Sequence, residues 1–187
     1  MRFFIASKIN DEYIDVLLKF NSFVKNSKFE VYNKLKFVEK ENIHLTYFFL
    51  GDIIDDEHKY NLMKSFEIFK NLNKIKFFST RLGYFPDKEK IKVIWADVDK
   101  EASEMLNDIH LKIKDILNRN KIYTNENFVP HITLARVKSL LFKDEVSHIS
   151  QFQFDKAFGF FENIALMNSV LSSRGPKYET VFEVKLL

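Results

Sequence analysis

The sequence contains no cysteine, only four glycines and only three prolines among its 187 residues. Without cysteine the chain cannot form a disulfide, a thiolate zinc site or a thiol nucleophile. No two glycines fall within one loop, which excludes the P-loop and the Rossmann dinucleotide fingerprint. The apolar N-terminal stretch from Phe3 to Ala6 is too short for a signal peptide or a membrane span. We therefore expect a cytoplasmic protein without membrane contact.

The residues that are present are typical of a globular domain, with 46% hydrophobic and 29% charged residues. A net charge of +3 is a weak bias for a nucleic-acid-binding protein, although it is compatible with a phosphate ligand. Arginine is scarce beside lysine, so an arginine is expected where a planar, bidentate donor is needed. Arg136 is a candidate for such a position.

Hydrophobic periodicity predicts strands and amphipathic helices along the whole chain. The predicted strands cover 2–9, 43–50, 74–85, 91–98, 131–137, 152–172 and 177–186. The predicted helices cover 11–24, 55–72, 100–120 and 143–150. Asn10 is expected to cap the first helix, and Met105 is expected on the apolar face of the third. The stretches before and after Pro86 are expected to pair as a hairpin.

The same order of predicted elements occurs twice in the chain. Residues 43–98 and residues 131–186 are each predicted to form a strand, a helix and a pair of strands. This repeat predicts two similar lobes related by an approximate two-fold axis, each a small antiparallel sheet with helices on its outer face. No linker rich in Pro, Gly or Ser separates the halves. Residues 1–187 are therefore predicted to form a single bilobal α+β domain with the active site in the groove between the lobes.

Two His-x-Thr motifs occupy the corresponding strand of each half, at His44 and Thr46 and at His131 and Thr133. Alternate side chains share one face of a strand, so each motif places an imidazole beside a hydroxyl. A single histidine on a strand is usually structural, but two motifs at matching positions indicate a shared site. We expect the four side chains to meet between the lobes.

A zinc site is the main alternative use of these histidines. Zinc requires three or four ligands, whereas each motif supplies only one, so the sequence predicts no metal site. The three other histidines, His58, His110 and His148, fall on predicted helices without a partner at ligand spacing. They are expected to be surface or packing residues.

Paired imidazoles and hydroxyls suit in-line displacement at phosphorus, which needs a base on the side of the entering oxygen and an acid on the side of the leaving one. Imidazoles with an ordinary pKa of about 6.5 can fill both roles near neutral pH. Threonine hydroxyls can hold the phosphoryl oxygens. This chemistry requires no metal or other cofactor if the substrate is already activated, and the residues alone leave open which histidine is the acid.

Longer segments surround these motifs: HLTYFFLG at 44–51, GYFP at 83–86, VIWA at 93–96, PHITLARV at 130–137 and GPKYE at 175–179. Their letters, order and spacing resemble the bacterial and archaeal RNA 2′,3′-cyclic phosphodiesterases, also called RNA 2′-5′ ligases. These enzymes are part of the two-histidine phosphoesterase superfamily. The resemblance extends over essentially the whole chain.

The resemblance implies metal-independent hydrolysis of RNA 2′,3′-cyclic phosphate ends to 2′-phosphomonoesters, with reversible 2′-5′ RNA ligation as a related activity. It implies that His44 donates a proton to the departing 3′ oxygen and that His131 accepts a proton from water. Thr46 and Thr133 would bind the phosphate.

Two further residues are implied as substrate-binding. Arg136 would add a charged donor to the phosphate, but its strand parity is opposite to that of His131. It therefore reaches the site only if the strand ends or twists before it. Tyr178 is a candidate for lining the nucleotide pocket, with a packing role as the alternative.

Two other functions stay open from the residues: a phosphodiesterase for a small 2′-5′-linked or cyclic nucleotide, and a non-catalytic RNA-end binding module. The binding module is the weaker alternative, because binding alone does not need both imidazoles. The expected partner is RNA with a 2′,3′-cyclic phosphate end, tRNA fragments being one candidate. We expect a monomer with no obligatory protein partner.

Overall fold

The computed structural model describes residues 2–27, 30–52, 55–87, 89–124, 127–172 and 175–187. The strands are β1 (Arg2–Lys8), β2 (Leu35–Phe37), β3 (His44–Gly51), β4 (Ile75–Phe77), β5 (Leu82–Phe85), β6 (Val93–Ala96), β7 (Ile132–Val137), β8 (Gly159–Phe161), β9 (Asn163–Ser172) and β10 (Gly175–Lys185). The α-helices are α1 (Asp11–Lys25), α2 (Val31–Lys34), α3 (Asp56–Ser65), α4 (Lys100–Arg119) and α5 (Lys143–Ile149). Two short 3₁₀ helices are η1 (Lys40–Asn42) and η2 (Phe66–Phe69).

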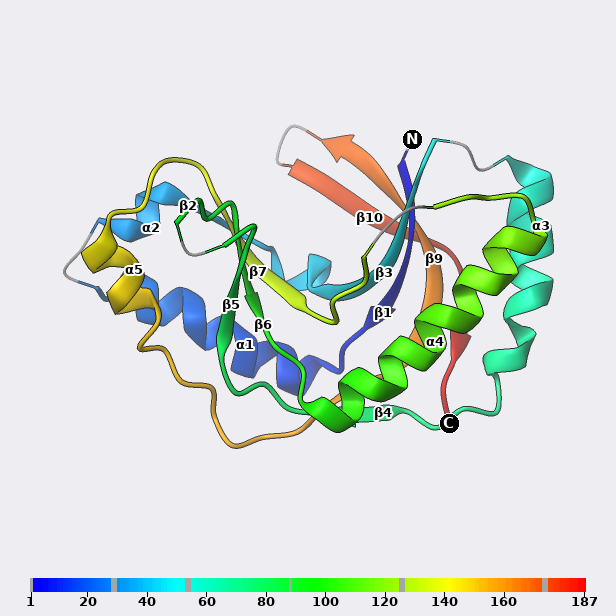
Figure 1. Cartoon of the computed structure of the whole chain (residues 1–187), viewed down its shortest axis with the longest axis horizontal. Helices are drawn as coiled ribbons and strands as arrows, with labels where there is room; N and C mark the ends of the chain where they lie inside the picture. The colour runs from blue at the N-terminus through cyan, green and yellow to red at the C-terminus, as the bar shows by residue number, and fades with distance from the viewer. Residues whose placement is uncertain (1, 28–29, 53–54, 88, 125–126, 173–174) are drawn as a thin grey trace.

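The strands form two four-stranded antiparallel sheets and a two-stranded ribbon (Figure 1). The strand order is β10-β9-β1-β3 in the first sheet and β2-β7-β6-β5 in the second, and β4 pairs with β8 in the ribbon. In Figure 1, α1, α2 and α5 lie at the end of the molecule that holds the second sheet, and α3 and α4 lie at the end that holds the first. The predicted α+β class with small antiparallel sheets is confirmed.

The two sheets do not follow the two halves of the sequence. The hairpin β5–β6 follows β3 along the chain but pairs with β7. The hairpin β9–β10 follows β7 but joins β3 through β1. The repeats 43–98 and 131–186 therefore do not each form one lobe, because each motif strand shares its sheet with a hairpin from the other half.

A single cluster of buried apolar side chains runs through both sheets. It includes Ile5 and Leu45 of the first sheet and Ile94 and Ile132 of the second. Leu45 and Ile132 are the central residues of the two His-x-Thr motifs, and both are fully buried. The alternation predicted for the motifs is therefore observed, with the apolar residue in the core and its polar neighbours on the opposite face.

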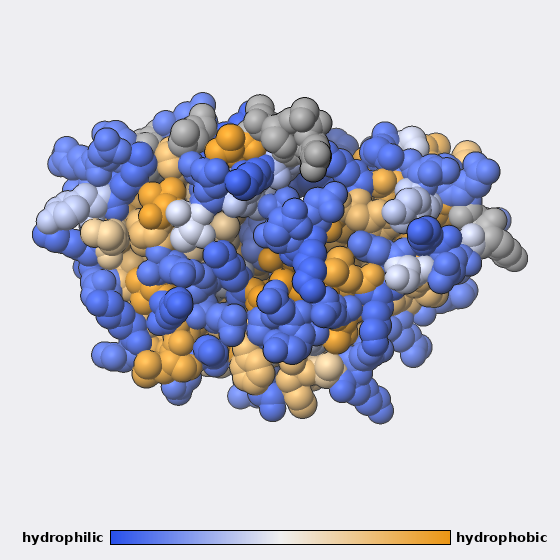
Figure 2. Space-filling model, turned by 180° about the vertical axis from the view of Figure 1, so that it is seen from behind, coloured by the Kyte–Doolittle hydropathy of each residue, from blue (hydrophilic) through white to orange (hydrophobic). Residues whose placement is uncertain are grey.

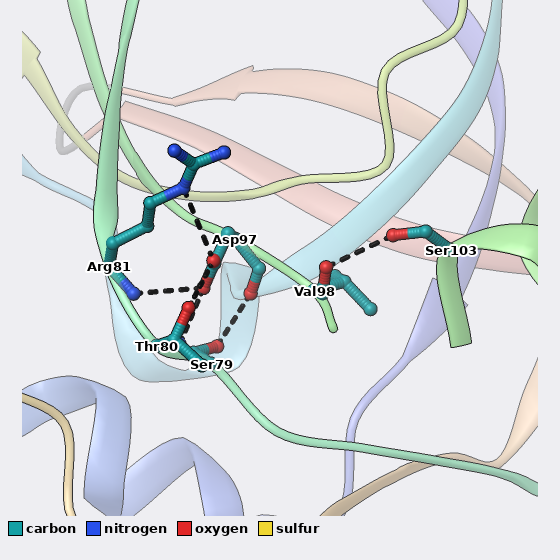
Figure 3. Close-up of polar contacts among 6 residues, drawn as sticks. All are labelled: Ser79, Thr80, Arg81, Asp97, Val98 and Ser103. Carbon is teal, nitrogen blue, oxygen red and sulfur yellow. Dashed lines mark hydrogen bonds and ion pairs between the residues drawn. The ribbon is translucent and has the colours of Figure 1, made fainter. Parts of the chain in front are cut away.

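The stretch 74–85 differs from its prediction as one continuous strand. Only β5 pairs with β6, while β4 pairs with β8. Between β4 and β5 the chain turns around Asp97, whose carboxylate accepts hydrogen bonds from the backbone N–H groups of Thr80 at 2.6 Å and Arg81 at 3.0 Å (Figure 3). A carboxylate that satisfies backbone amides in this way offers the chain an alternative to strand pairing.

Three helix predictions need correction in detail. Asn10 stands at the start of α1, but its side-chain oxygen accepts from the backbone N–H of Phe160 instead of capping the helix. The predicted helix 55–72 is α3 followed by the 3₁₀ helix η2. Met105 is 42% exposed, because its neighbour Leu106 takes the buried position on the apolar face of α4, the face that also carries Ile109.

The surface seen from the side opposite to Figure 1 is mainly hydrophilic, with apolar residues in separate patches between polar ones (Figure 2). None of the helices in the described ranges is both long enough and apolar enough to cross a membrane. The turn predicted at 172–176 falls partly on 173–174, which lie outside the described residues.

Candidate active site

The six predicted site residues all line one cleft of ≈ 1060 Å³, which receives side chains from both sheets. This volume is slightly above the usual range for small-molecule sites, about 300–1,000 Å³, and is sufficient for a nucleotide. The predicted residues at the cleft are His44, Thr46, His131, Thr133, Arg136 and Tyr178. The exchange of hairpins between the halves brings the two motif strands together at this position.

Arg136 faces the cleft because β7 contains a bulge. Thr133 pairs with Trp95 and Ala135 pairs with Ile94, so Leu134 has no partner on β6. An extra residue inverts the alternation of side chains beyond it. Leu134 and Ala135 are consequently both buried, and Arg136 returns to the face that carries Thr133.

The same irregularity occurs in β3, where Tyr47 has no partner on β1. The bulge buries Tyr47 and Phe48 in succession and turns Phe49 to the cleft, where 59% of it is exposed. Phe49 thus stands five residues after His44, as Arg136 stands five residues after His131. The two half-sites therefore share a β-bulge but differ in the side chain that the bulge turns to the cleft. It is a cation in the half-site of His131 and an aromatic ring in the half-site of His44.

Both imidazoles are oriented by a hydrogen bond within their own segment. Nδ1 of His44 lies 2.7 Å from the backbone oxygen of Asn42, and Nδ1 of His131 lies 2.7 Å from that of Val129. A carbonyl can only accept, so each Nδ1 carries a proton and donates it. In the neutral imidazole, Nε2 is then the unprotonated nitrogen in both rings.

Nε2 of His44 lies 2.9 Å from Oγ1 of Thr46. Because the unprotonated nitrogen is an acceptor, the threonine hydroxyl donates this hydrogen bond. The motif therefore joins the two groups that its spacing predicted to be neighbours. Protonation of Nε2 would reverse the bond and free the hydroxyl hydrogen for another acceptor.

Aromatic rings surround both histidines. The His44 ring centroid lies 5.2 Å from that of Phe4 and 5.3 Å from that of Tyr178, which meets it edge-on. Tyr178 also contacts Phe4, at 5.0 Å. The predicted pocket residue Tyr178 is therefore part of the wall around His44, on β10.

Phe85 and Trp95 form the corresponding wall around His131, with centroid distances of 4.9 and 5.8 Å. Trp95 occupies the space above Gly83, where a Cβ atom would lie 2.1 Å from the indole ring. Gly83 is required here for close approach of the ring. The GYFP and VIWA segments thus supply the wall of the second half-site.

The surroundings lower the pKa of both histidines. Burial lowers the pKa of His44 to about 4, the hydrogen bond to the Asn42 carbonyl opposes this, and the charges of His131 and Arg136 add to the lowering. Burial also lowers the pKa of His131, with the Arg136 charge acting in the same direction. Both imidazoles are therefore mainly neutral near pH 7 in the free protein, and a bound anion would favour their protonation.

The site includes groups that the motifs did not reveal. The carbonyls of Asn42 and Val129 come two residues before each histidine, and no feature of side-chain type marks them. Most of the 21 phenylalanines do not line the cleft, so residue type alone could not single out Phe4, Phe49 and Phe85, which do. Within the described residues, no three His, Cys, Asp or Glu side chains gather in a group that could hold a metal ion.

The remaining histidines lie where a surface or packing role was expected. Nδ1 of His58 is 2.7 Å from the carboxylate of Asp55 at the start of α3. His110 and His148 stack on phenylalanine rings, His148 on Phe23 at 4.8 Å. None of the three lines the cleft.

A model of the AKAP7 2′5′ RNA ligase-like domain family matches residues 1–180. The chain belongs to this family. It is similar to the RNA 2′,3′-cyclic phosphodiesterase of Methanocaldococcus jannaschii, with 31% identity over 185 residues that cover 98% of this chain and 99% of the relative. The enzyme of the same name from Aquifex aeolicus is 33% identical over 172 residues, which cover 81% of each chain.

Solved structures share the fold of this RNA ligase-like chain. The protein TT0787 of Thermus thermophilus has a TM-score of 0.76 and 23% identity, covering 100% of this chain and 98% of its own. Escherichia coli LigT complexed with 3′-AMP has a TM-score of 0.75 and 18% identity, covering 99% and 97%. The membership of the two-histidine phosphoesterases implied by the motifs is confirmed.

The electrostatics of the site can be tested without a substrate. In the free protein, NMR titration should give His44 a pKa near 4, well below the ordinary 6.5. Arg136→Gln should raise the pKa of both histidines, because the guanidinium charge disfavours their protonation. Arg81→Gln removes an arginine that pairs with Asp97 and does not line the cleft, so it should leave both titrations unchanged. A His44 that titrates near 6.5 would contradict the buried, cationic environment described above.

Proposed function

We propose that this chain hydrolyses RNA 2′,3′-cyclic phosphate ends to 2′-phosphomonoesters, with no metal or other cofactor. The observation that carries the proposal is the pair of imidazoles that share one cleft with two threonine hydroxyls and an arginine. Relatives that match nearly the whole chain and are named RNA 2′,3′-cyclic phosphodiesterases support the substrate class.

In the proposed reaction, His131 takes a proton from water through Nε2, and the water oxygen attacks phosphorus. The bond from phosphorus to the 3′ oxygen breaks on the opposite side, and His44 gives its Nε2 proton to that oxygen. The product carries a free 3′ hydroxyl and a 2′ phosphate. If an RNA 5′ hydroxyl replaces the water, the same displacement forms a 2′-5′ linkage, which gives reversible ligation.

The phosphoryl oxygens need donors while this displacement proceeds. Arg136 offers a planar pair of N–H donors and a full charge. Thr133 offers its hydroxyl, and Thr46 does so once His44 is protonated and no longer accepts the Thr46 hydrogen. Tyr178 is proposed to line the nucleotide pocket beside His44. The proton on His44 therefore serves two purposes, since it supplies the leaving oxygen and releases a donor for the phosphate.

The lowered pKa of His44 needs an explanation if His44 is the acid. A cyclic phosphate carries one negative charge, and an anion beside an imidazole raises its pKa. Binding of the substrate therefore draws a proton onto the site. Linkage makes this reciprocal, so the substrate binds more tightly to the protonated site than to the neutral one.

Further proposals concern the molecule as a whole. We propose that residues 1–187 act as one bilobal domain, which the continuous core through both sheets supports. The chain is proposed to work as a monomer in the cytoplasm without an obligatory protein partner. Its lack of cysteine is compatible with a reducing compartment. Among RNA substrates, tRNA fragments with cyclic phosphate ends are one candidate.

Two alternatives make different predictions. A phosphodiesterase for a small 2′-5′-linked or cyclic nucleotide would use the same four residues but would prefer the mononucleotide to an RNA end. A non-catalytic RNA-end binding module would bind the cyclic phosphate without turnover. Parallel assays of a short RNA with a 2′,3′-cyclic phosphate end, of the matching nucleoside 2′,3′-cyclic phosphate and of a 2′-5′-linked dinucleotide distinguish all three.

The direct test is incubation with a short RNA that ends in a 2′,3′-cyclic phosphate, with separation of 2′- and 3′-phosphate products. We expect the 2′-phosphate, with the same rate in excess EDTA. His44→Ala and His131→Ala should each lower kcat/KM by about 10³ or more, because an acid or a base is lost. The matched control His58→Ala changes a surface histidine of α3 and should have wild-type activity. Turnover by a folded His44→Ala or His131→Ala protein within about tenfold of wild type would contradict the assignment.

The pH dependence follows from the lowered histidine pKa values. The kcat/KM profile reports the free enzyme, which must hold one proton on the histidine pair. The pKa of His44 is about 4, and that of His131 is also below its ordinary value of 6.5. The kcat/KM profile should therefore peak at a pH between the pKa values of the two histidines and decline at higher pH. The kcat profile should extend to higher pH, because the bound phosphate raises both pKa values. A kcat/KM optimum at a pH above 6.5 would contradict the burial and the positive charge to which the lowered histidine pKa values are attributed.

A further inference from the structure

The two arginines that line the cleft are also the two described arginines that form no ion pair. Of the five arginines in the chain, Arg174 lies outside the described residues, and Arg81 and Arg119 each form an ion pair with an aspartate. Arg2 and Arg136 pair with no carboxylate in the described part of the chain, and both line the cleft. Arg136 is proposed above to bind the reacting phosphate. Arg2 is therefore a second cation of the cleft, and its charge has no assigned role.

Strand pairing places Arg2 on the cleft face of the first sheet. β1 pairs with β9 without interruption from Arg2 to Ala6, so side chains alternate between the two faces along this stretch. Phe3 belongs to the main core, whereas Phe4 packs with Tyr178 in a separate cluster at the cleft. Arg2 therefore shares the face of Phe4, and its Cα atom lies about 7 Å further along the strand.

Arg2 stands in a row of polar side chains that crosses three strands. Its partner on β9 is Ser169, and the partner of Ser169 on β10 is Tyr178. Residues that are directly opposite each other share a face, and all three line the cleft. A guanidinium beside hydroxyl groups is a set of donors that suits a phosphate. Asp52 is the one acidic side chain among the described residues of the cleft, and it forms no ion pair with Arg2.

The proposed reaction determines on which side of the phosphorus the nucleoside lies. In-line displacement puts the leaving 3′ oxygen opposite the entering water. His44 is proposed to protonate the 3′ oxygen, so the ribose that carries this oxygen lies on the His44 side, beside the rings of Phe4 and Tyr178. On this side the cleft continues along the first sheet past Phe4 to Arg2 and Ser169. An RNA chain attached to the 5′ oxygen of the ribose can follow this part of the cleft.

We propose that Arg2 binds the phosphodiester that joins the reacting nucleotide to the rest of the RNA chain, and so gives the enzyme a preference for an RNA end over a mononucleotide. The inference rests on the proposed function and adds a second phosphate subsite to it. A nucleoside 2′,3′-cyclic phosphate leaves this subsite empty, because its 5′ oxygen carries no phosphate. The cleft volume of ≈ 1060 Å³ is large enough for a ligand that extends beyond the reacting nucleotide.

The first arm of the test varies the substrate and uses the wild-type protein. The substrates are a dinucleotide that ends in a 2′,3′-cyclic phosphate, the same dinucleotide with a neutral methylphosphonate linkage, and the matching nucleoside 2′,3′-cyclic phosphate. We expect kcat/KM to be about tenfold higher on the charged dinucleotide than on the other two, as one charge-assisted hydrogen bond implies. The difference should lie in KM, because a phosphate far from the reacting atoms is bound equally in the ground and transition states.

The second arm varies the protein. Arg2→Gln should lower kcat/KM about tenfold on the charged dinucleotide and stay within about twofold of wild type on the two substrates that lack this charge. Arg119→Gln is the matched control, because it removes an exposed arginine of α4 that does not line the cleft, and it should match wild type on all three substrates. A tenfold preference for the charged dinucleotide that persists in Arg2→Gln would overturn the proposal. An equal loss on the nucleoside cyclic phosphate would also overturn it, because Arg2 would then act on the reacting nucleotide or on the fold.

A binding measurement separates this inference from the proposed function. Calorimetry gives the Kd of a dinucleotide that ends in a 2′-phosphate, and of its methylphosphonate counterpart, without any turnover. The charged ligand should bind about tenfold more tightly to wild type, and the two ligands should bind equally to Arg2→Gln. A wild-type protein that hydrolyses none of the cyclic phosphates would refute the proposed function. Equal Kd values of the two ligands for wild type would overturn the role of Arg2 in either case.

Discussion

The hydrogen bond from each Nδ1 to a carbonyl two residues upstream is the interaction on which the chemistry of the cleft depends. It fixes the tautomer, so that Nε2 is the nitrogen available to accept or give a proton. It also fixes the ring plane against the aromatic residues beside it. Without this bond, a histidine at the same position would present either nitrogen, and the Thr46 hydroxyl would have no defined acceptor.

The two bulges occupy matching positions in the backbone of the two half-sites, but they turn different side chains to the cleft. Both bring the residue five positions after the histidine to the cleft, but in β7 this is Arg136 and in β3 it is Phe49. The cation therefore stands on β7, which begins directly after His131, and it contributes to lowering the pKa of both imidazoles. The cleft therefore presents the guanidinium of Arg136 at the end of one half-site and the exposed ring of Phe49 at the corresponding position of the other. The two imidazoles consequently lie in unequal surroundings.

Local patterns in the sequence were sufficient to predict the two motifs, their shared face and most of the elements that carry them. Strand parity correctly placed Leu45 and Ile132 in the core and the histidines and threonines opposite. The position of Arg136 could not be read in this way, because a bulge depends on pairing with another strand and leaves no mark in the alternation of residue types. The same holds for the turn around Asp97 and for the exchange of hairpins between the sheets, which are set by long-range contacts.

The central claim assigns the acid to His44 and the base to His131, and a change of leaving atom tests it most directly. In a cyclic phosphate whose bridging 3′ oxygen is replaced by sulfur, the leaving thiolate needs no proton. With this substrate, His44→Ala should recover most of its lost rate relative to wild type, whereas His131→Ala should remain slow because water still requires a base. Recovery of His131→Ala in place of His44→Ala would reverse the assignment, and recovery of neither variant would contradict acid–base catalysis by this pair of histidines.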